Sequence, residues 1–384
     1  MKYRELGKDK IKVSQLGFGC MRFPIIGDDT KNVDVEKTRE LLKVAVNNGV
    51  NYIDTAYPYH GGMSEGVVGK ILNEENLRDK VFLTSKLSLW MVESANKLND
   101  FLNDQLKRSK QDYFDFYIIH ALNKKSWQTA KDYKALEFLT KAKKEGKIKY
   151  TGFSFHDESL DLFKEIVDSY DWDMVQIQYN YLDENYQAGK EGLEYCKSKG
   201  IGCVIMEPLK GGQLATKLPP TAENTFKQAD KDASFASWSF KWLLNQDNVK
   251  VILSGMGALE EVLDNIKSAS KYEVNSLSAS DNNTIESVVK ILNKGKHIDC
   301  TNCKYCLPCP QGVLIPNNFA YYNKYYNFDT DKNRKSVKNM YKSVFSDEEK
   351  ASACVECGLC ETHCPQHLEI RDLLKEVTNT LVDK

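Results

Sequence analysis

The stretch NYIDTAYPYHGGMSE, residues 51–65, begins as a short apolar run that ends at Asp54. Such a run predicts a buried parallel strand with a carboxylate at its C-terminal end. Tyr59 follows five residues later, after Pro58 and before two glycines, so we expect it on a loop rather than inside a helix. The stretch therefore predicts an acid and a phenol beside the end of one strand.

Two later apolar runs end in the same way. VFLTSK closes on Lys86, and FDFYIIH closes on His120. An acid, a phenol, an amine and an imidazole thus arrive at the C-terminal ends of neighbouring strands. In a parallel β/α barrel, chemistry is done on that face.

A rhythm of strand followed by helix continues along the chain. The helical segments between the strands repeat their apolar residues three and four apart, as in VEKTRELLKVAVNNG. Eight strand and helix units within about 270 residues predict a TIM barrel, (β/α)8, after a short hairpin over residues 1–14. The expected barrel strands span 16–19, 51–55, 81–86, 114–120, 148–154, 174–180, 202–207 and 250–255.

Composition narrows the class of protein. The 384 residues have 41% hydrophobic content and a net charge of -1, with no basic stripe that would indicate nucleic-acid binding. No apolar run is long enough to span a bilayer, and the start MKYRELGKDK lacks the apolar core of a signal peptide. We expect a cytoplasmic protein that binds neither membranes nor nucleic acid.

Cysteines are concentrated near the C-terminus. Eight of the eleven lie between Cys300 and Cys364. A disulfide scaffold would spread its cysteines along a small secreted chain, so this clustering in an otherwise ordinary intracellular protein favours a metal site. The change in composition near residue 290 predicts two domains, residues 1–290 and 291–384. A polar insertion at 214–232, after the seventh strand, fits either a lid over the site or an idle surface loop.

The four groups at the strand ends suit proton transfer. A phenol with an ordinary pKa of about 10 exchanges protons poorly near neutral pH, but a neighbouring ammonium lowers that pKa. Asp54 would hold the Lys86 ammonium charged beside Tyr59, while His120 would orient a substrate carbonyl. Each of these side chains taken alone could have a structural role, as an ion pair, a rim aromatic or a core histidine. The presence of all four at three successive strand ends favours a catalytic site.

The cysteine spacing predicts iron-sulfur clusters. Three thiolates spaced by two residues can bind one [4Fe-4S] cluster, and a fourth cysteine before proline binds the other cluster. Zinc is the alternative, although structural zinc sites usually use separated pairs of ligands. The expected ligand sets are Cys300, Cys303, Cys306 and Cys364 for one cluster, and Cys354, Cys357, Cys360 and Cys309 for the other.

The first 270 residues resemble the aldo-keto reductases. The ordered motifs are YRELG, VSQLGFGCM, DTA followed by Tyr59, TSK, DYFDFYIIH, GKIKYTGFS, VQIQYN, GIGCVIMEPLKGG and VILSGMGALEEVLDN. The resemblance implies a barrel fold, a nicotinamide cofactor, NAD(P)(H), and a carbonyl or alcohol substrate. It also implies that Tyr59 is the general acid/base, supported by Asp54, Lys86 and His120.

The same resemblance implies cofactor contacts. It assigns Ser154 and Gln176 to the nicotinamide carboxamide, Leu209, Lys210 and Gly211 to the diphosphate, and Ser254, Gly255 and Asn265 to the adenosine end. Met206 stands where many members place an aromatic ring. Glu261 stands where NADPH-preferring members often have Arg, and a carboxylate there would repel a 2'-phosphate. We therefore predict a weak NADH preference, or weak nicotinamide binding altogether.

The C-terminal part resembles the two-cluster bacterial ferredoxins, in a helical version, because more than forty residues separate its motifs. The whole chain is similar to the branch of aldo-keto reductases with a C-terminal iron-sulfur domain. Clusters pass single electrons whereas nicotinamide delivers a hydride, so a bound flavin would bridge the two. The alternative functions are a redox relay or sensor that passes electrons to a ferredoxin-like partner, and clusters that serve only as structural staples.

Overall fold

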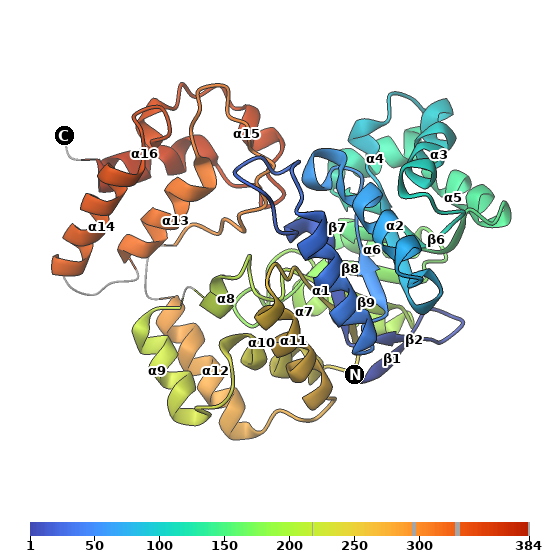
Figure 1. Ribbon diagram of the computed structural model, residues 1–384, viewed down its shortest axis with the longest axis horizontal. Coiled ribbons are helices and arrows are strands. Elements are labelled where there is room, and N and C mark those ends of the chain that lie inside the picture. The colour runs from blue at the N-terminus through green and yellow to red at the C-terminus, as the bar shows by residue number, and fades with distance from the viewer. Residues whose placement is uncertain (217, 294–296, 327–330, 383–384) are drawn as a thin grey trace. The chain divides into compact units, whose positions relative to one another are not determined.

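The computed structural model describes residues 1–216, 218–293, 297–326 and 331–382 (Figure 1). The chain divides into two compact units. The first, which we call the barrel unit, comprises Met1–Pro208 and Ala236–Ser278, and the second, the cysteine unit, comprises Leu209–Phe235 and Ala279–Lys384. The domain boundary that the sequence predicts near residue 290 stays a prediction.

Eight parallel strands close into a barrel, as predicted. Each strand pairs with its neighbours along the chain, and the last strand pairs with the first. Parallel strands present their C-terminal ends at one rim, so residues at those ends meet. The strands are β3 (Leu16–Gly19), β4 (Tyr52–Asp54), β5 (Phe82–Leu87), β6 (Phe114–Leu122), β7 (Ile148–Phe155), β8 (Met174–Gln178), β9 (Gly202–Met206) and β10 (Val249–Ser254).

Helices follow the strands and form the outer layer of the barrel unit (Figure 1). The first begins after Asp34, whose carboxylate accepts a hydrogen bond from the Lys37 N–H, and it buries one apolar stripe. The helices are α1 (Val35–Asn47), α2 (Ser64–Glu74), α3 (Leu98–Ser109), α4 (Lys124–Asp132), α5 (Ala135–Lys144), α6 (Leu160–Asp168), α7 (Gly189–Ser198), α10 (Phe235–Leu244) and α11 (Leu259–Lys271).

An antiparallel hairpin, β1 (Tyr3–Leu6) and β2 (Ile11–Ser14), precedes the barrel as predicted. Its Leu6 and Val13 belong to the same buried cluster as inward-facing residues of the strands. Burying such side chains contributes roughly 1.5–3 kcal/mol each. The hairpin therefore extends the barrel core beyond the strands themselves. The strand residues of this cluster are Tyr52, Phe116, Ile118, Met174, Val204, Val251 and Leu253.

Helices α2 and α3 approach closely at Gly69. A Cβ atom placed there would lie 1.7 Å from the backbone oxygen of Ser109, so only glycine allows this packing. The contact fixes the position of α2, which begins directly after the loop that contains Tyr59.

The cysteine unit is helical, as predicted. Helix α13 packs against both α14 and α16, around twelve buried residues. The insertion at 214–232 is largely helical rather than a loop, because it contains most of α8 and all of α9, which packs on α12. The helices are α8 (Gln213–Thr216), α9 (Pro220–Ala229), α12 (Ala279–Leu292), α13 (Ile315–Tyr326), α14 (Asp331–Val344), α15 (Leu359–Thr362) and α16 (Ile370–Leu381).

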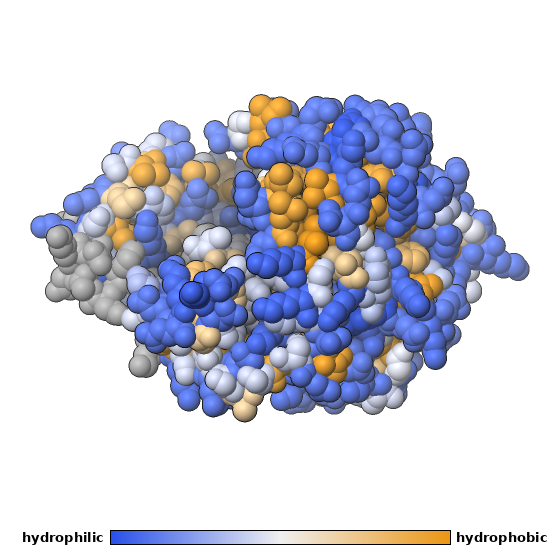
Figure 2. Space-filling model, turned by 60° about the horizontal axis from the view of Figure 1, so that its bottom comes forward, coloured by the Kyte–Doolittle hydropathy of each residue, from blue (hydrophilic) through white to orange (hydrophobic). Residues whose placement is uncertain are grey.

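The surface is mostly hydrophilic on the face seen in Figure 2, with scattered apolar patches. The most exposed large apolar side chains include Trp90 in the barrel unit and Val355 and Leu359 in the cysteine unit. Among the residues that the structure describes, none of the helices combines the length and apolar character that crossing a bilayer requires.

Candidate active site

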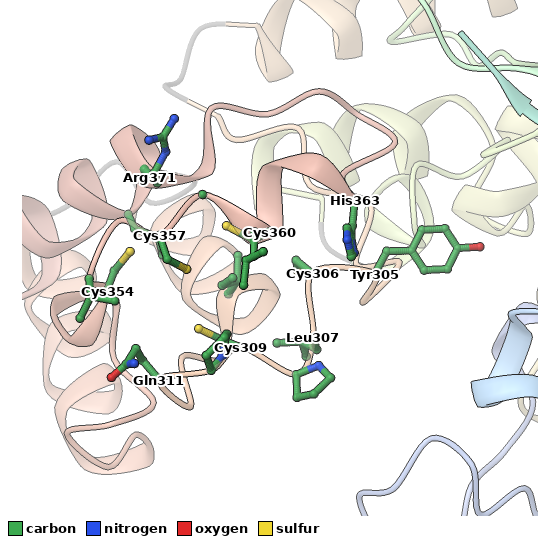
Figure 3. A pocket seen from close by; sticks show the side chains of 17 residues that line it. Tyr305, Cys306, Leu307, Cys309, Gln311, Cys354, Cys357, Cys360, His363 and Arg371 are labelled. Atoms are coloured by element: carbon green, nitrogen blue, oxygen red, sulfur yellow. The ribbon is translucent and has the colours of Figure 1, made fainter. Parts of the chain in front are cut away.

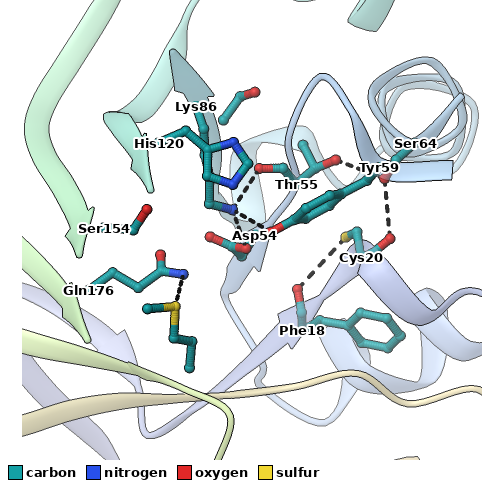
Figure 4. A network of polar contacts seen from close by, with 12 residues as sticks. Phe18, Cys20, Asp54, Thr55, Tyr59, Ser64, Lys86, His120, Ser154 and Gln176 are labelled. Carbon is teal, nitrogen blue, oxygen red and sulfur yellow. Dashed lines mark hydrogen bonds and ion pairs between the residues drawn. The ribbon is translucent and has the colours of Figure 1, made fainter. Parts of the chain in front are cut away.

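Four side chains predicted from the sequence meet at the C-terminal rim of the barrel (Figure 4). Asp54 ends β4, Lys86 lies near the end of β5, and His120 lies near the end of β6. Tyr59 begins a short 3-10 helix, η2 (Tyr59–Gly62), in the loop after β4. All four side chains are buried.

Lys86 is the centre of this group. Its Nζ donates to Asp54 Oδ1 at 2.6 Å, to the Thr55 backbone oxygen at 3.0 Å and to Tyr59 Oη at 3.1 Å. Three acceptors use the three N–H donors of an ammonium. The geometry therefore orients a positive charge toward the phenol oxygen.

Burial sets the protonation of the neighbouring groups. It raises the pKa of the Asp54 carboxyl, and the Lys86 ammonium opposes that rise. Burial also holds the pKa of His120 well below its usual range, with smaller contributions from the charges of Lys86 and His156. The imidazole of His120 is accordingly neutral at pH 7.

A second network of buried polar groups bonds to the backbone of strand β5 at Lys86. Gln105 on α3 donates through Nε2 to Glu65 Oε1 at 2.7 Å and to the Lys86 backbone oxygen at 3.1 Å. Its Oε1 accepts from Tyr117 Oη at 2.5 Å, and Ser85 Oγ donates to Glu65. Gln105 is fully buried, although α3 is rich in charged residues.

His120 has two neighbours that sequence reasoning did not assign to it. Its Nδ1 lies 2.8 Å from Ser88 Oγ, and the Trp90 ring centroid lies 4.9 Å from the imidazole centroid. Both residues follow directly after β5. The only sequence signal is their position one and three residues after the end of that strand.

Two candidate contacts for the nicotinamide carboxamide lie near the ends of neighbouring strands. Ser154 and Gln176, at the ends of β7 and β8, belong to the barrel unit. Ser154 Oγ accepts from the Ala121 N–H at 2.7 Å, which leaves its hydroxyl proton to donate. Gln176 Nε2 donates to Met206 Sδ at 3.7 Å, and its buried Oε1 has no partner within the described part of the chain. These groups fit a carboxamide that both donates and accepts.

The candidate adenosine contacts cluster after β10. Asn265 Nδ2 donates to Ser254 Oγ at 2.8 Å, and the Gly257 N–H donates to Glu261 Oε2 at 2.8 Å. Gly255 packs against Arg22, whose side-chain carbons would lie about 3 Å from an added Cβ. Glu261 therefore presents a carboxylate in the first turn of α11, beside this loop.

The remaining candidate contacts, Leu209 and Gly211, belong to the cysteine unit. Between them, the buried Lys210 pairs with Asp299 at 3.0 Å. A Cβ on Gly211 would lie 2.2 Å from the Thr301 backbone oxygen, so the two backbones touch. Sequence reasoning missed this contact because some ninety residues separate the two segments.

The eight C-terminal cysteines gather around two cavities. One is lined by Cys309, Cys354, Cys357 and Cys360, together with Cys306, and Figure 3 shows several of these sulfurs around it. The other is lined by Cys300, Cys303, Cys306 and Cys364. Each cavity thus has the cysteines of one predicted ligand set, and Cys306 stands between the two.

Among the described residues, no group of three or more His, Cys, Asp or Glu side chains is arranged to hold a single metal ion. A zinc ion needs four sulfurs at about 2.3 Å from one centre, whereas a [4Fe-4S] cluster separates its ligands over the corners of a cube. Burial raises the pKa of the Cys360 thiol to about 11, so a thiolate there requires a cation.

Comparisons with known proteins match a family profile to each of two parts of the chain. The Aldo/keto reductase family profile matches residues 15–290, and the 4Fe-4S dicluster domain profile matches residues 299–368. L-galactose dehydrogenase of Arabidopsis thaliana is 27% identical over 315 residues, which cover 77% of this chain and 95% of that protein. NADH-specific methylglyoxal reductase of Escherichia coli is 26% identical, covering 69% and 93%.

Solved structures show the same barrel. A thermostable aldo-keto reductase in complex with the inhibitor epalrestat matches with a TM-score of 0.61 and 28% identity, over 75% of this chain and 100% of that one. The holo form of an aldo-keto reductase from Bacillus halodurans matches with a TM-score of 0.61 and 24% identity, over 75% and 96%, which shows the fold alone. The chain belongs to the aldo/keto reductase family, as an oxidoreductase with a nicotinamide cofactor, and it contains a 4Fe-4S dicluster domain.

Proposed function

We propose that the barrel transfers a hydride between nicotinamide and the carbonyl or alcohol carbon of a small substrate, while Tyr59 transfers the proton. The observation that supports this most is the Lys86 ammonium, which bonds to both Asp54 and the Tyr59 oxygen. The positive charge favours a negative phenol oxygen, so the phenol can donate its proton to a substrate oxygen and recover it. Asp54 holds the ammonium in place.

The remaining residues of the site orient the substrate. In the reduction direction, bound nicotinamide supplies the hydride to the carbonyl carbon. Tyr59 gives its proton to the oxygen on which negative charge develops, and neutral His120 lies beside it as a hydrogen-bonding group, with ring centroids 6.1 Å apart. The network of Gln105 and Glu65 keeps the Lys86 strand fixed during this step.

Ser154 and Gln176 would hold the carboxamide of nicotinamide. Gln176 Oε1, buried without a partner among the described residues, accepts an amide N–H there. Leu209, Gly211, Ser254, Gly255 and Asn265 would contact the rest of the cofactor, and Met206 would lie against the nicotinamide ring with weaker stacking than an aromatic residue.

We propose a preference for NADH. The Glu261 carboxylate would lie near the adenosine ribose, where it repels a 2'-phosphate and accepts from a 2'-hydroxyl. The name of the Escherichia coli relative, NADH-specific methylglyoxal reductase, agrees with this choice for that protein. Titration with each nucleotide tests it: NADPH that binds more tightly than NADH would refute the charge argument.

The cysteine unit is proposed to hold two [4Fe-4S] clusters with crossed ligands. Cys300, Cys303, Cys306 and Cys364 would bind one, and Cys354, Cys357, Cys360 and Cys309 would bind the other. The two cavities lined by these sets support the assignment.

A redox relay is the second candidate function. Cys357 is exposed, and the exposed apolar side chains of Val355 and Leu359 flank it two residues to either side. A cluster bound there would lie close to the surface, where a ferredoxin-like protein could exchange single electrons with it. A bound flavin would convert those electrons into a hydride. Clusters that serve only as structural staples are the third interpretation.

One experiment separates these functions. Anaerobically purified protein is analysed for iron, and its absorbance spectrum is recorded with and without NADH. About eight irons per chain, together with a loss of cluster absorbance on adding NADH, would support a relay. Eight irons without bleaching, together with carbonyl reduction that depends on Tyr59, supports staples. Flavin bands in the absorbance spectrum would identify a bound flavin as the group that converts single electrons into a hydride. Absence of iron would refute the clusters.

A further inference from the structure

His120 is held by a serine that its sequence motif does not include. Ser88, one residue beyond the end of β5, places its Oγ 2.8 Å from His120 Nδ1. Ser88 is fully buried and His120 is 5% exposed, so water does not compete for this bond. One nitrogen of the imidazole is thus committed to a protein partner.

The direction of this hydrogen bond follows from the polar groups available. Within the described residues, Nδ1 is the one partner found for Ser88 Oγ. If Nδ1–H donated to the hydroxyl, the serine proton would lack an acceptor in a buried position, which is costly. If the hydroxyl donates to Nδ1, its proton is used and the hydrogen of the ring resides on Nε2.

A neutral imidazole carries a single N–H, on either Nδ1 or Nε2. Burial holds the pKa of His120 well below its usual range, so the ring is neutral and one nitrogen donates while the other accepts. The ring is also fixed in orientation, because the Trp90 centroid lies 4.9 Å from it and the Tyr59 centroid 6.1 Å. Rotation about the ring axis would break the bond to Ser88.

We propose that Ser88 is a positioning residue that holds His120 in the tautomer with hydrogen on Nε2, so that the imidazole donates to the substrate oxygen. The opposite tautomer would turn a lone pair toward that oxygen and repel the negative charge that develops there. This inference rests on the proposed carbonyl chemistry for its consequence, whereas the tautomer itself is a property of the free protein.

The tautomer is measured directly by nitrogen NMR. The protein is labelled with 15N-histidine, and the His120 signals are identified among the six histidines by their loss in His120→Gln. We expect a protonated Nε2 and a bare Nδ1 in the wild type. Ser88→Ala should mix the two tautomers, and Ser88→Thr, which keeps the hydroxyl, should restore the wild-type pattern. A protonated Nδ1 in the wild type would overturn the proposal.

Kinetics supply the second readout. Ser88→Ala should lower kcat/KM for a carbonyl substrate roughly tenfold, mainly through kcat, because the lost bond strengthens as charge develops. Ser88→Thr should recover most of the loss. The control is Ser94→Ala, whose hydroxyl bonds to Asn96 instead of His120. An unchanged tautomer and unchanged kcat in Ser88→Ala would overturn the proposal.

The two proposals fail separately. Undiminished turnover in Tyr59→Phe would refute the catalytic site and leave the NMR result for His120 intact. A mixed or reversed tautomer in the wild type, with turnover that still depends on Tyr59, would refute the role of Ser88 alone.

Discussion

The candidate active site and the cysteine region differ in how much of their geometry the polypeptide completes by itself. Lys86 has three hydrogen-bond acceptors within 3.1 Å and is almost fully buried. The eight cysteines instead line two cavities, and the described side chains form no arrangement for a single ion. A site made of charged side chains is built by the fold, whereas a site made of thiols is finished by its metal.

The two regions also differ in the cores that support them. The active site lies on a closed barrel of eight strands. The cysteine unit has a cluster of twelve buried residues, against which six of the cysteines pack: Cys300, Cys306, Cys309, Cys354, Cys360 and Cys364. A core of that size is marginal alone, so cluster binding should supply much of its stability.

Removal of iron should therefore produce the largest difference in stability between the cysteine unit and the barrel unit. We expect chelation under anaerobic conditions to lower hydrogen-exchange protection in α13 and α16 roughly 1,000-fold, because the sulfurs lose the groups that connect them. Protection in the barrel strands should stay unchanged. The measurement is amide exchange by mass spectrometry on holo and iron-depleted protein.

A zinc chelator that leaves iron in place is the matched control for this experiment. Equal protection of α13 and α16 with and without iron would contradict the comparison, since it would mean that the polypeptide completes both regions alone.

Replacement of Tyr59 by Phe should have the next largest effect. The variant keeps the ring and removes the proton donor, so kcat should fall by roughly 10²- to 10⁴-fold. Cluster absorbance should not change, whereas barrel stability should fall by roughly 1–3 kcal/mol, because the buried Lys86 ammonium loses one of its three acceptors. Steady-state reduction of a panel of carbonyl compounds provides the measurement.

Tyr57→Phe is the matched control, two residues earlier in the same loop. Its ring stacks on Phe101 at 4.8 Å, a contact that phenylalanine preserves, so its turnover should match that of the wild type. Equal turnover in all three proteins would remove Tyr59 from the mechanism.

Much of the barrel site follows from sequence because strand ends carry their own signal. Apolar runs that end on Asp54, Lys86 and His120 predict both the strands and the rim on which these side chains meet. The cysteine motifs likewise predict which thiols share a cavity, since their spacing repeats. These signals are local, and the fold only has to bring the strand ends together.

The missed contacts depend on packing between distant segments. Gln105 lies in a charge-rich helix, where nothing local distinguishes the one buried amide from solvated neighbours. The pairing of Lys210 with Asp299 joins residues far apart in the chain and has no periodic pattern. Ser88 is one of many serines, and only its distance to His120 reveals its role.

A charge reversal at Glu261 should sharpen the comparison by altering the barrel site without affecting the clusters. Glu261→Arg replaces a carboxylate in the first turn of α11 by a group that can pair with a 2'-phosphate. We expect the ratio of NADPH to NADH affinity to rise roughly tenfold, or about 1.4 kcal/mol. Fluorescence titration with both nucleotides measures the ratio.

Glu260→Arg is the matched control, because it adds the same charge on the same helix turn. An equal shift in both variants would reflect general electrostatic attraction rather than a contact at residue 261.

The pH dependence of barrel stability is the smallest expected effect, and it belongs to the barrel unit alone. The pKa of His120 is well below its usual value near 6.5 because the side chain is buried. The unfolded chain therefore binds a proton that the folded chain does not. His120 contributes stability that is complete above pH 6.5 and is lost progressively as pH falls toward the folded pKa, by up to about 1.4 kcal/mol per pH unit.

Tryptophan fluorescence isolates this effect, because all five tryptophans lie in the barrel unit. Urea unfolding between pH 7.5 and 5.5 should show a shallower loss of stability in His120→Gln than in the wild type. The raised pKa of Asp54 has the opposite sign, since its folded form binds a proton more readily, but it is common to both proteins and cancels in the difference. His363→Gln, at an exposed position of the cysteine unit, should keep the wild-type slope. Parallel slopes in the wild type and His120→Gln would mean that the imidazole binds protons equally in the folded and unfolded chains, so that burial does not lower the pKa of His120.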